Sequence, residues 1–214
     1  LSGYQGAPQM GRTILDAAEL VRRRNPQAIY CCDPVMGDVG RGFYTAPGIP
    51  EFMRDHVVPQ ATIITPNLFE LEYLTGRTTD SFTEVLQAAA ALRSRGPQTV
   101  LVTSVVGVGN GATAHNGQPA EHMRMIAQNQ TETWLVNTPL IDRMFTGSGD
   151  LTTAIFLSNL LSSGGDLGHS LSMTASSVFS VLQTTHDLGR DELALVQAQD
   201  DIVAPRHRFE ATRI

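Results

Sequence analysis

Three short apolar runs, separated from one another by helical patterns, constrain the fold of this chain more than any other feature. They read QAIYCCDPV at residues 27–35, ATIITPN at 61–67 and QTVLVTS at 98–104. Apolar runs of this length, bounded by turn residues, are typical of strands that are buried on both faces. Helical spacing occupies residues 10–26, 49–59, 68–76 and 81–96. This alternation predicts an α/β fold with a mostly parallel central sheet flanked by helices on both faces.

The remainder of the chain divides into three parts. Residues 107–137 are punctuated by Gly107, Gly109, Gly111 and Gly117, which favours an antiparallel meander of strands. Residues 151–165 and 167–189 carry two long helical patterns, and a strand or short helix and then a loop follow them. We therefore expect one domain over residues 1–214.

Local signals define several helix ends. Ser81 followed by Glu84 forms a capping box, which predicts that a helix begins there. Gly76 after the pattern at 68–75 predicts the end of another helix, because glycine adopts the left-handed conformation that closes a helix.

Charge and composition exclude several classes of function. The formal net charge is −6, which argues against nucleic acid or an anionic membrane as the main partner. The sequence contains no lysine, so neither a P-loop lysine nor a Schiff-base lysine is available. No run of about 18 apolar residues is present, so we expect no membrane span.

The two cysteines, Cys31 and Cys32, are adjacent in a predicted strand, so their side chains should point to opposite faces of the sheet. They can build neither a disulfide framework nor a zinc site. We therefore expect a reducing, cytoplasmic compartment.

Polar residues follow each of the three apolar runs. Asp33 follows the first, Thr65 and Asn67 the second, and Thr103 and Ser104 the third. Ligands of parallel α/β sheets bind beyond the carboxyl ends of the strands, where these side chains should lie together. The alternative is that polar residues end strands only because loops are solvated.

The stretch MFTGSGDLTTAIF, residues 144–156, places a glycine turn directly before a helix. Gly147, Ser148 and Gly149 can present free backbone N–H groups to an anion, because a helix start carries partial positive charge and glycine has no Cβ. Asp150 beside that anion would be repulsive unless it accepts a proton from an attacking hydroxyl. A base next to an anion hole predicts a phosphotransferase site.

These motifs resemble those of a known enzyme family. TGSGD before an apolar helix resembles the G-x-G-D motif of the ribokinase-like superfamily. CDPVMGD at 32–38 and TPNLFELEYLTG at 65–76 resemble the vitamin kinases of that superfamily, and the pyridoxal kinases most closely. LSGYQG at the start and AQDDIVAPRHRFEAT near the end also fit, so the resemblance covers nearly the whole chain.

The resemblance implies a role for individual residues. Asp150 matches the catalytic base, which also contacts the substrate, and Gly147, Ser148 and Gly149 match the anion hole. Tyr4 falls on a substrate-binding position, and Asp38 on a second acidic position that some members use. The ATP-binding positions are Asp33, Thr65, Glu70, Thr103, Thr138, Pro139, Leu140 and Ile141, and the Mg²⁺ positions are Asp33, Asn67 and Glu70. Because Mg²⁺ keeps several waters, one or two carboxylates plus phosphates are enough to bind it.

The implied activity is ATP-dependent phosphorylation of the 5′-hydroxyl of pyridoxal, in a homodimer that uses Mg²⁺. Two alternatives stay open. One is a hydroxymethylpyrimidine kinase, although Asp150 and the Gly37–Asp38 pair favour pyridoxal. The other is a nucleotide-binding fragment without turnover. The N-terminal quarter of a family member, which includes its first strands, has no counterpart in this sequence before Leu1. Without lysine, an arginine such as Arg41 is a candidate for the phosphate charge, although a solvated loop residue is the simpler interpretation of Arg41.

Overall fold

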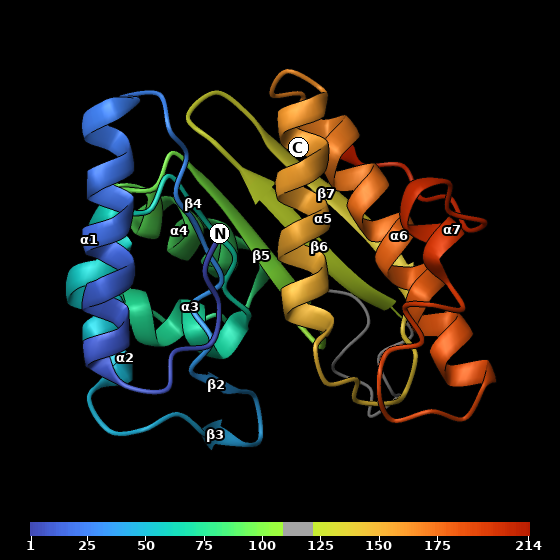
Figure 1. The fold of residues 1–214 in the computed structure, drawn as a ribbon. Coiled ribbons are helices and arrows are strands. Elements are labelled where there is room, and N and C mark those ends of the chain that lie inside the picture. The colour runs from blue at the N-terminus through green and yellow to red at the C-terminus, as the bar shows by residue number, and fades with distance from the viewer. Residues whose placement is uncertain (109–121) are drawn as a thin grey trace.

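The central element of the fold is a six-stranded sheet with the order β1-β4-β5-β6-β7-β8 (Figure 1). A computed structural model describes residues 1–108 and 122–214. Gly109, Gly111 and Gly117, which we assigned to the meander, lie outside the described residues. The strands are β1 (Cys31–Cys32), β4 (Ile63–Ile64), β5 (Thr99–Val105), β6 (His122–Gln128), β7 (Thr133–Pro139) and β8 (Thr212–Arg213).

The sheet is parallel at its start and antiparallel afterwards. β1 pairs with β4 and β4 with β5 in parallel, as the alternation of apolar runs and helices predicts. β5–β6, β6–β7 and β7–β8 are antiparallel pairs, which confirms the predicted meander for the described strands. Because the parallel strands come first, the loops that follow β1, β4 and β5 all leave from one edge of the sheet.

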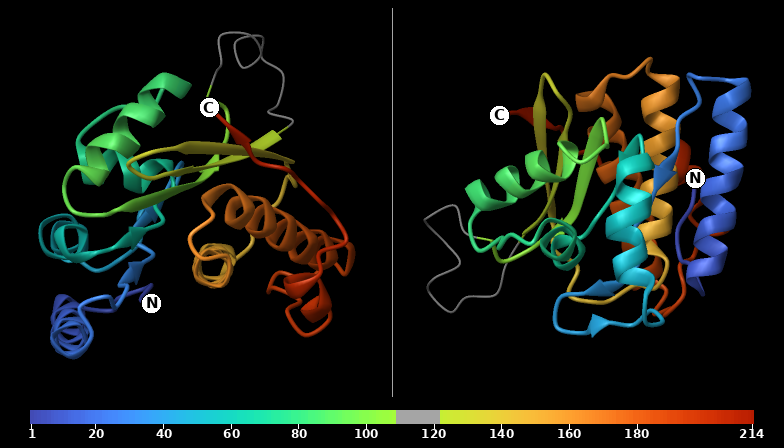
Figure 2. Two further views of the ribbon diagram at one scale, coloured as in Figure 1. Left: turned by 90° about the horizontal axis from the view of Figure 1, so that it is seen from above. Right: turned by 90° about the vertical axis from the view of Figure 1, so that its left-hand side faces the viewer.

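Helices cover both faces of the sheet, which confirms the predicted fold class. They are α1 (Pro8–Arg24), α2 (Ile49–Phe52), α3 (Leu68–Thr75), α4 (Phe82–Arg93), α5 (Ser148–Ser162), α6 (Leu167–Asp187) and α7 (Gln199–Val203). A π-helical turn over Met53–Val57 and a 3₁₀ turn over Val58–Gln60 continue α2, so the predicted helix at 49–59 changes its winding along its length. Seen from above, the sheet separates α3 and α4 from α5 and α6 (Figure 2).

The predicted helix signals are present. Ser81 and Glu84 form the complete capping box at the start of α4. Gly76 follows α3 with φ 67°, the left-handed conformation expected of a glycine there.

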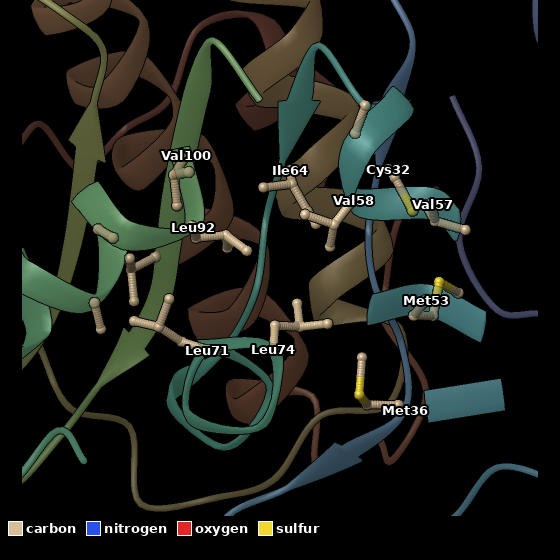
Figure 3. Packing of buried hydrophobic residues seen from close by; sticks show 14 of the residues in the cluster. Cys32, Met36, Met53, Val57, Val58, Ile64, Leu71, Leu74, Leu92 and Val100 are labelled. Atoms are coloured by element: carbon tan, nitrogen blue, oxygen red, sulfur yellow. The ribbon is translucent and has the colours of Figure 1, made fainter. Parts of the chain in front are cut away.

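Two hydrophobic cores lie on the two faces of the sheet, and the alternation of side chains along the strands assigns residues to them. Cys32, Ile64 and Val100 face the core under α3 and α4 (Figure 3). Cys31 and Ile63 face the core under α5 and α6. The neighbouring cysteines therefore point to opposite faces, as the strand periodicity predicts.

A small hairpin, which the sequence patterns did not indicate, follows β1. Its strands are β2 (Gly37–Asp38) and β3 (Gly42–Phe43), and it lies at the same end of the molecule as the loop that leads into α5 (Figures 1 and 2). The ring of Phe43 packs edge-on against Phe69 of α3, with centroids 5.0 Å apart. In the part of the chain that the structure describes, no helix is both long enough and apolar enough to cross a membrane.

Candidate active site

A cavity of about 640 Å³ opens at the carboxyl ends of the parallel strands. Loops after β1, β4 and β5 form one side of it, and the loop from β7 into α5 forms the other. The sequence-predicted residues that line it are Tyr4, Asp33, Asp38, Arg41, Thr65, Asn67, Glu70, Thr103, Ser104, Pro139, Leu140, Ile141, Gly147, Ser148, Gly149 and Asp150. The sheet therefore brings these widely separated residues to one edge, as the rule for parallel sheets predicts.

The glycine turn before α5 has the geometry of an anion hole. Gly147 precedes the helix with φ 87° and ψ 0°, a conformation that L side chains rarely adopt. The helix begins at Ser148, so its first backbone N–H groups have no acceptor within the helix. With the helix dipole added, these groups can bind a phosphate oxygen.

Asp150 lies in the first turn of α5 and lines the same cavity. Its carboxylate approaches the N-terminal segment, since a Cβ built on Gly3 would lie 2.8 Å from Asp150 Oδ1. Asp150 therefore faces the cleft that holds the loops after β1 and β4, as a catalytic base must.

Asp33 lies across from the start of α5. A Cβ built on Gly149 would lie 3.2 Å from Asp33 Oδ2. Burial, with the negative charge of Asp150 as a second cause, raises the pKa of Asp33 to about 7. Asp33 is only 5% exposed, and within residues 1–108 and 122–214 no hydrogen-bond donor acts on its pKa, only burial and the charge of Asp150. A buried carboxylate of this kind is suited to a cation or a water from the cavity.

Glu70 and Asn67 have partners within the protein, which the motif alone did not reveal. Glu70 accepts hydrogen bonds from the backbone N–H groups of Met36 and Asn67, both at 3.0 Å. Asn67 accepts from the Glu70 N–H at 2.9 Å and donates to the Gly37 carbonyl at 2.8 Å. The pair is a second capping box, and it attaches the loop after β1 to the start of α3.

Burial raises the pKa of Glu70 to about 8, although the backbone donors at Asn67, Met36 and Gly37 oppose that rise. Each Glu70 oxygen and the amide oxygen of Asn67 already accept one backbone hydrogen bond, which favours contact with a metal ion through water over direct ligation. Asp33 is the residue of the predicted Mg²⁺ set whose oxygens face the cavity without protein donors. In the described ranges, no three His, Cys, Asp or Glu side chains gather as a metal cluster. One carboxylate with phosphates and waters still suits Mg²⁺.

Threonines join the second strand to the anion hole. The hydroxyl of Thr65 hydrogen-bonds to that of Thr153 at 2.8 Å, and Thr153 donates to the Gly149 carbonyl at 3.0 Å. Both hydroxyls are buried, so this link holds the first turn of α5 against the end of β4.

The end of β5 carries a local distortion. Thr103 and Ser104 both line the cavity, and Ser104 has φ 54°, the one positive φ of a non-glycine residue in the described segments. The register between β5 and β6 shifts between Val102 and Val105, so Ser104 lies in a bulge. Bulges of this kind re-aim side chains next to functional sites.

Thr138 differs from its neighbours in the predicted ATP-binding segment. Pro139, Leu140 and Ile141 line the cavity, but Thr138 is buried in β7 and is not among the lining residues. Side chains alternate along a strand, so Thr138 and Pro139 face opposite sides. The Thr138 side chain therefore lies away from the cavity, and its predicted contact with ATP stays a prediction.

Several cavity residues were missed by the sequence analysis. Tyr44 follows the β2–β3 hairpin, and burial raises its pKa to about 12. Phe179 and Leu182 of α6 supply an apolar wall, and Arg143 supplies a cation. The absence of lysine was the sequence signal that indicated an arginine for the phosphate charge. It led to Arg41, which also lines the cavity, but not to Arg143.

Comparisons with known proteins agree with this geometry. The model of the phosphomethylpyrimidine kinase family matches residues 10–195. A pyridoxal kinase of Rubrobacter xylanophilus is 47% identical over 214 residues, all of this chain and 71% of that protein. The crystal structure of the Entamoeba histolytica pyridoxal kinase superposes with a TM-score of 0.82 at 25% identity, covering 99% of this chain and 71% of that one.

A Leishmania donovani pyridoxal kinase in complex with ADP and pyridoxine superposes with a TM-score of 0.85 at 22% identity. That match covers all of this chain and 73% of the other, and it supports the fold.

Proposed function

The chain belongs to the phosphomethylpyrimidine kinase family and, within it, to the pyridoxal kinases, and we propose that it transfers the γ-phosphoryl group of ATP to the 5′-hydroxyl of pyridoxal. The observation that carries this proposal is the position of Asp150. Its carboxylate stands in the first turn of α5, beside helix N–H groups without acceptors in the helix, and lines the same cavity as Asp33. A base, an anion site and a buried acid in one cleft are the parts that phosphoryl transfer needs.

The chemistry follows from these positions. Asp150 accepts the proton of the 5′-hydroxyl as the oxygen attacks the γ-phosphorus. The bond between that phosphorus and the bridging oxygen of ATP breaks, and ADP leaves with the electron pair. The N–H groups at Ser148 and Gly149, which belong to the first turn of α5 and line the cavity, stabilise the charge on the transferred group.

Asp33 would hold Mg²⁺ at this site, and Glu70 and Asn67 would contribute through water. When bound, Mg²⁺ supplies positive charge that neutralises the phosphates. Asp33 itself has its pKa raised to about 7 by burial, so a cation beside it would favour its ionised form.

The apolar wall suits a nucleobase. Phe179, Leu182, Pro139 and Leu140 border the cavity next to the anion hole. The ADP complex of the Leishmania donovani enzyme supports ATP as the co-substrate. Tyr4 lines the same cavity, and its neighbour Gly3 lies beside the Asp150 carboxylate, which supports the predicted contact of Tyr4 with pyridoxal.

A coupled assay of ADP release tests the proposal. We expect ATP consumption with pyridoxal and Mg²⁺, formation of pyridoxal 5′-phosphate, and no turnover when EDTA removes the metal. Hydroxymethylpyrimidine serves as the competing substrate, because the matched family model carries the phosphomethylpyrimidine kinase name. Preference for hydroxymethylpyrimidine would overturn the pyridoxal assignment, and nucleotide binding without turnover of either compound would support the fragment alternative.

The homodimer and the cytoplasmic location implied earlier remain proposals. The buried thiols of Cys31 and Cys32, both free, are compatible with a reducing compartment. Light scattering of the purified chain would measure its oligomeric state directly.

A further inference from the structure

The cavity is lined by more acidic than cationic side chains, although its proposed ligand is an anion. Its lining includes four acidic side chains, two of which have a pKa raised by burial, and a nucleoside triphosphate that enters it brings several negative charges. The carboxylates are Asp33, Asp38, Glu70 and Asp150. No lysine exists in the chain to offset them. Within the described part of the chain, the cationic side chains along the cavity are Arg41 and Arg143.

The two arginines differ in position. Arg41 is in the turn between β2 and β3, is exposed, and stacks over the ring of Tyr44 with 5.3 Å from its guanidinium carbon to the centroid. Arg143 lies on the loop that leads into α5, four residues before Gly147, and its side chain is only 27% exposed. Arg143 is therefore the cation that belongs to the same segment as the anion hole.

The Arg143 side chain stacks over the Phe145 ring at 5.9 Å and forms an ion pair with the exposed Asp191, and the ion pair is the weakly held contact. Its Nη2 donates to Asp191 Oδ1 at 2.5 Å, but the Asp191 side chain is 98% exposed on the loop after α6. Such a pair contributes little to stability because water screens the carboxylate. A phosphate inside the cavity offers the planar guanidinium two oxygens at once, in a less solvated place.

The loop does not depend on this ion pair for its position. Thr146 forms a parallel bridge with Glu192, and a Cβ built on Gly147 would lie 3.7 Å from Leu193. The backbone N–H of Arg143 also bonds to the Ile141 carbonyl at 2.7 Å. The turn before α5 is thus held by backbone contacts that remain when the Arg143 side chain changes partner.

We propose that Arg143 exchanges Asp191 for the phosphates of the bound nucleoside triphosphate and serves as a phosphate-binding residue. The inference rests on the proposed kinase function and extends it to a named cation. Asp191 holds the guanidinium near the cavity in the empty enzyme, and the nucleotide replaces it there.

The test compares a non-hydrolysable ATP analogue with adenosine, by calorimetric titration of the full chain in the presence of Mg²⁺. Arg143→Gln is expected to weaken binding of the analogue about tenfold, as loss of a charge-assisted contact does, and to leave adenosine binding unchanged. Arg143→Lys should recover part of that loss. Asp191→Asn breaks the same ion pair but keeps the cation, so it should bind the analogue as tightly as the wild type or more tightly.

Three results would overturn the inference: unchanged affinity of Arg143→Gln for the analogue, an equal loss for adenosine, or the same loss in Asp191→Asn. The last of these would show that the pair only supports the loop. Failure of the wild-type chain to bind the analogue at all would instead contradict the proposed kinase function. Thermal melts of each variant establish that it is folded, and Arg143→Lys keeps the test available if the glutamine variant is not.

Discussion

Replacing the Asp150 carboxylate with the amide of Asn tests the proposed reaction most directly. The substitution keeps the size of the side chain that approaches Gly3, so the start of α5 should stay in place. It removes the group that accepts the proton of the attacking hydroxyl. General bases contribute about 10²- to 10⁴-fold, so kcat should fall by that factor, a rise of roughly 3–5 kcal/mol in the barrier.

Unlike kcat, the affinity for ATP should not fall when Asp150 is replaced by Asn. The carboxylate of Asp150 repels the phosphates that the N–H groups of α5 attract, so its removal should leave the Kd for ATP unchanged or lower it. It also removes one cause of the raised pKa of Asp33, which should move back toward the ordinary range of an aspartate.

The assay is a steady-state measurement of ADP release with pyridoxal, together with calorimetric titration of ATP. Asp142→Asn is the matched control, because Asp142 is exposed on the same loop but does not line the cavity. It removes the same charge and should retain wild-type kcat. If Asp150→Asn keeps more than about a tenth of wild-type kcat, or if Asp142→Asn loses as much activity, Asp150 is not the base.

Three predictions concern the free energy of unfolding and buried groups in or near the cavity. The pKa of Asp33 is raised to about 7 in the fold, so its stabilising contribution is full below the unfolded pKa near 3.8 and is lost as pH rises through 7. In metal-free buffer, the free energy of unfolding of Asp33→Asn should therefore exceed that of the wild type by about 2–3 kcal/mol more at pH 8 than at pH 5. Thermal melts that show the same difference at both pH values would contradict this. Glu70→Gln should lower the free energy of unfolding by about 1–3 kcal/mol in urea, because the amide keeps one acceptor oxygen for two buried backbone donors and turns a donor toward the other. Glu84→Gln in the more exposed capping box should cost under about 1 kcal/mol, and similar losses in the two variants would refute the difference. Gly37→Ala should lower the free energy of unfolding by about 1–3 kcal/mol, since its Cβ would lie 2.3 Å from an aromatic carbon, while Gly6→Ala, with open space around it, should stay near wild type.

Local features of this protein were predictable from the sequence, because their causes lie within a few residues. The capping box at Ser81 and Glu84 and the left-handed Gly76 depend only on neighbouring backbone groups. The opposite faces of Cys31 and Cys32 follow from strand periodicity. The gathering of Asp33 and Thr65 at one edge follows from the rule for parallel sheets.

The roles of Glu70 and Arg143 were decided by tertiary structure. N-x-x-E has the spacing of a metal motif and of a capping box alike, and only the approach of the Met36 N–H shows that the Glu70 oxygens are occupied. Arg143 has its ion pair with Asp191, 48 residues later in the chain, because the end of α6 comes back to the loop before α5.

By itself, then, the sequence determined the order of the main strands and helices, several helix ends, and a carboxylate placed next to a glycine turn. The tertiary structure alone decided which oxygens remain free, which cation borders the cavity, and how far burial moves the pKa of Asp33 and Glu70. The physical reason is range: backbone preferences act over a few residues, whereas desolvation and pairing depend on whatever distant segment the fold brings alongside.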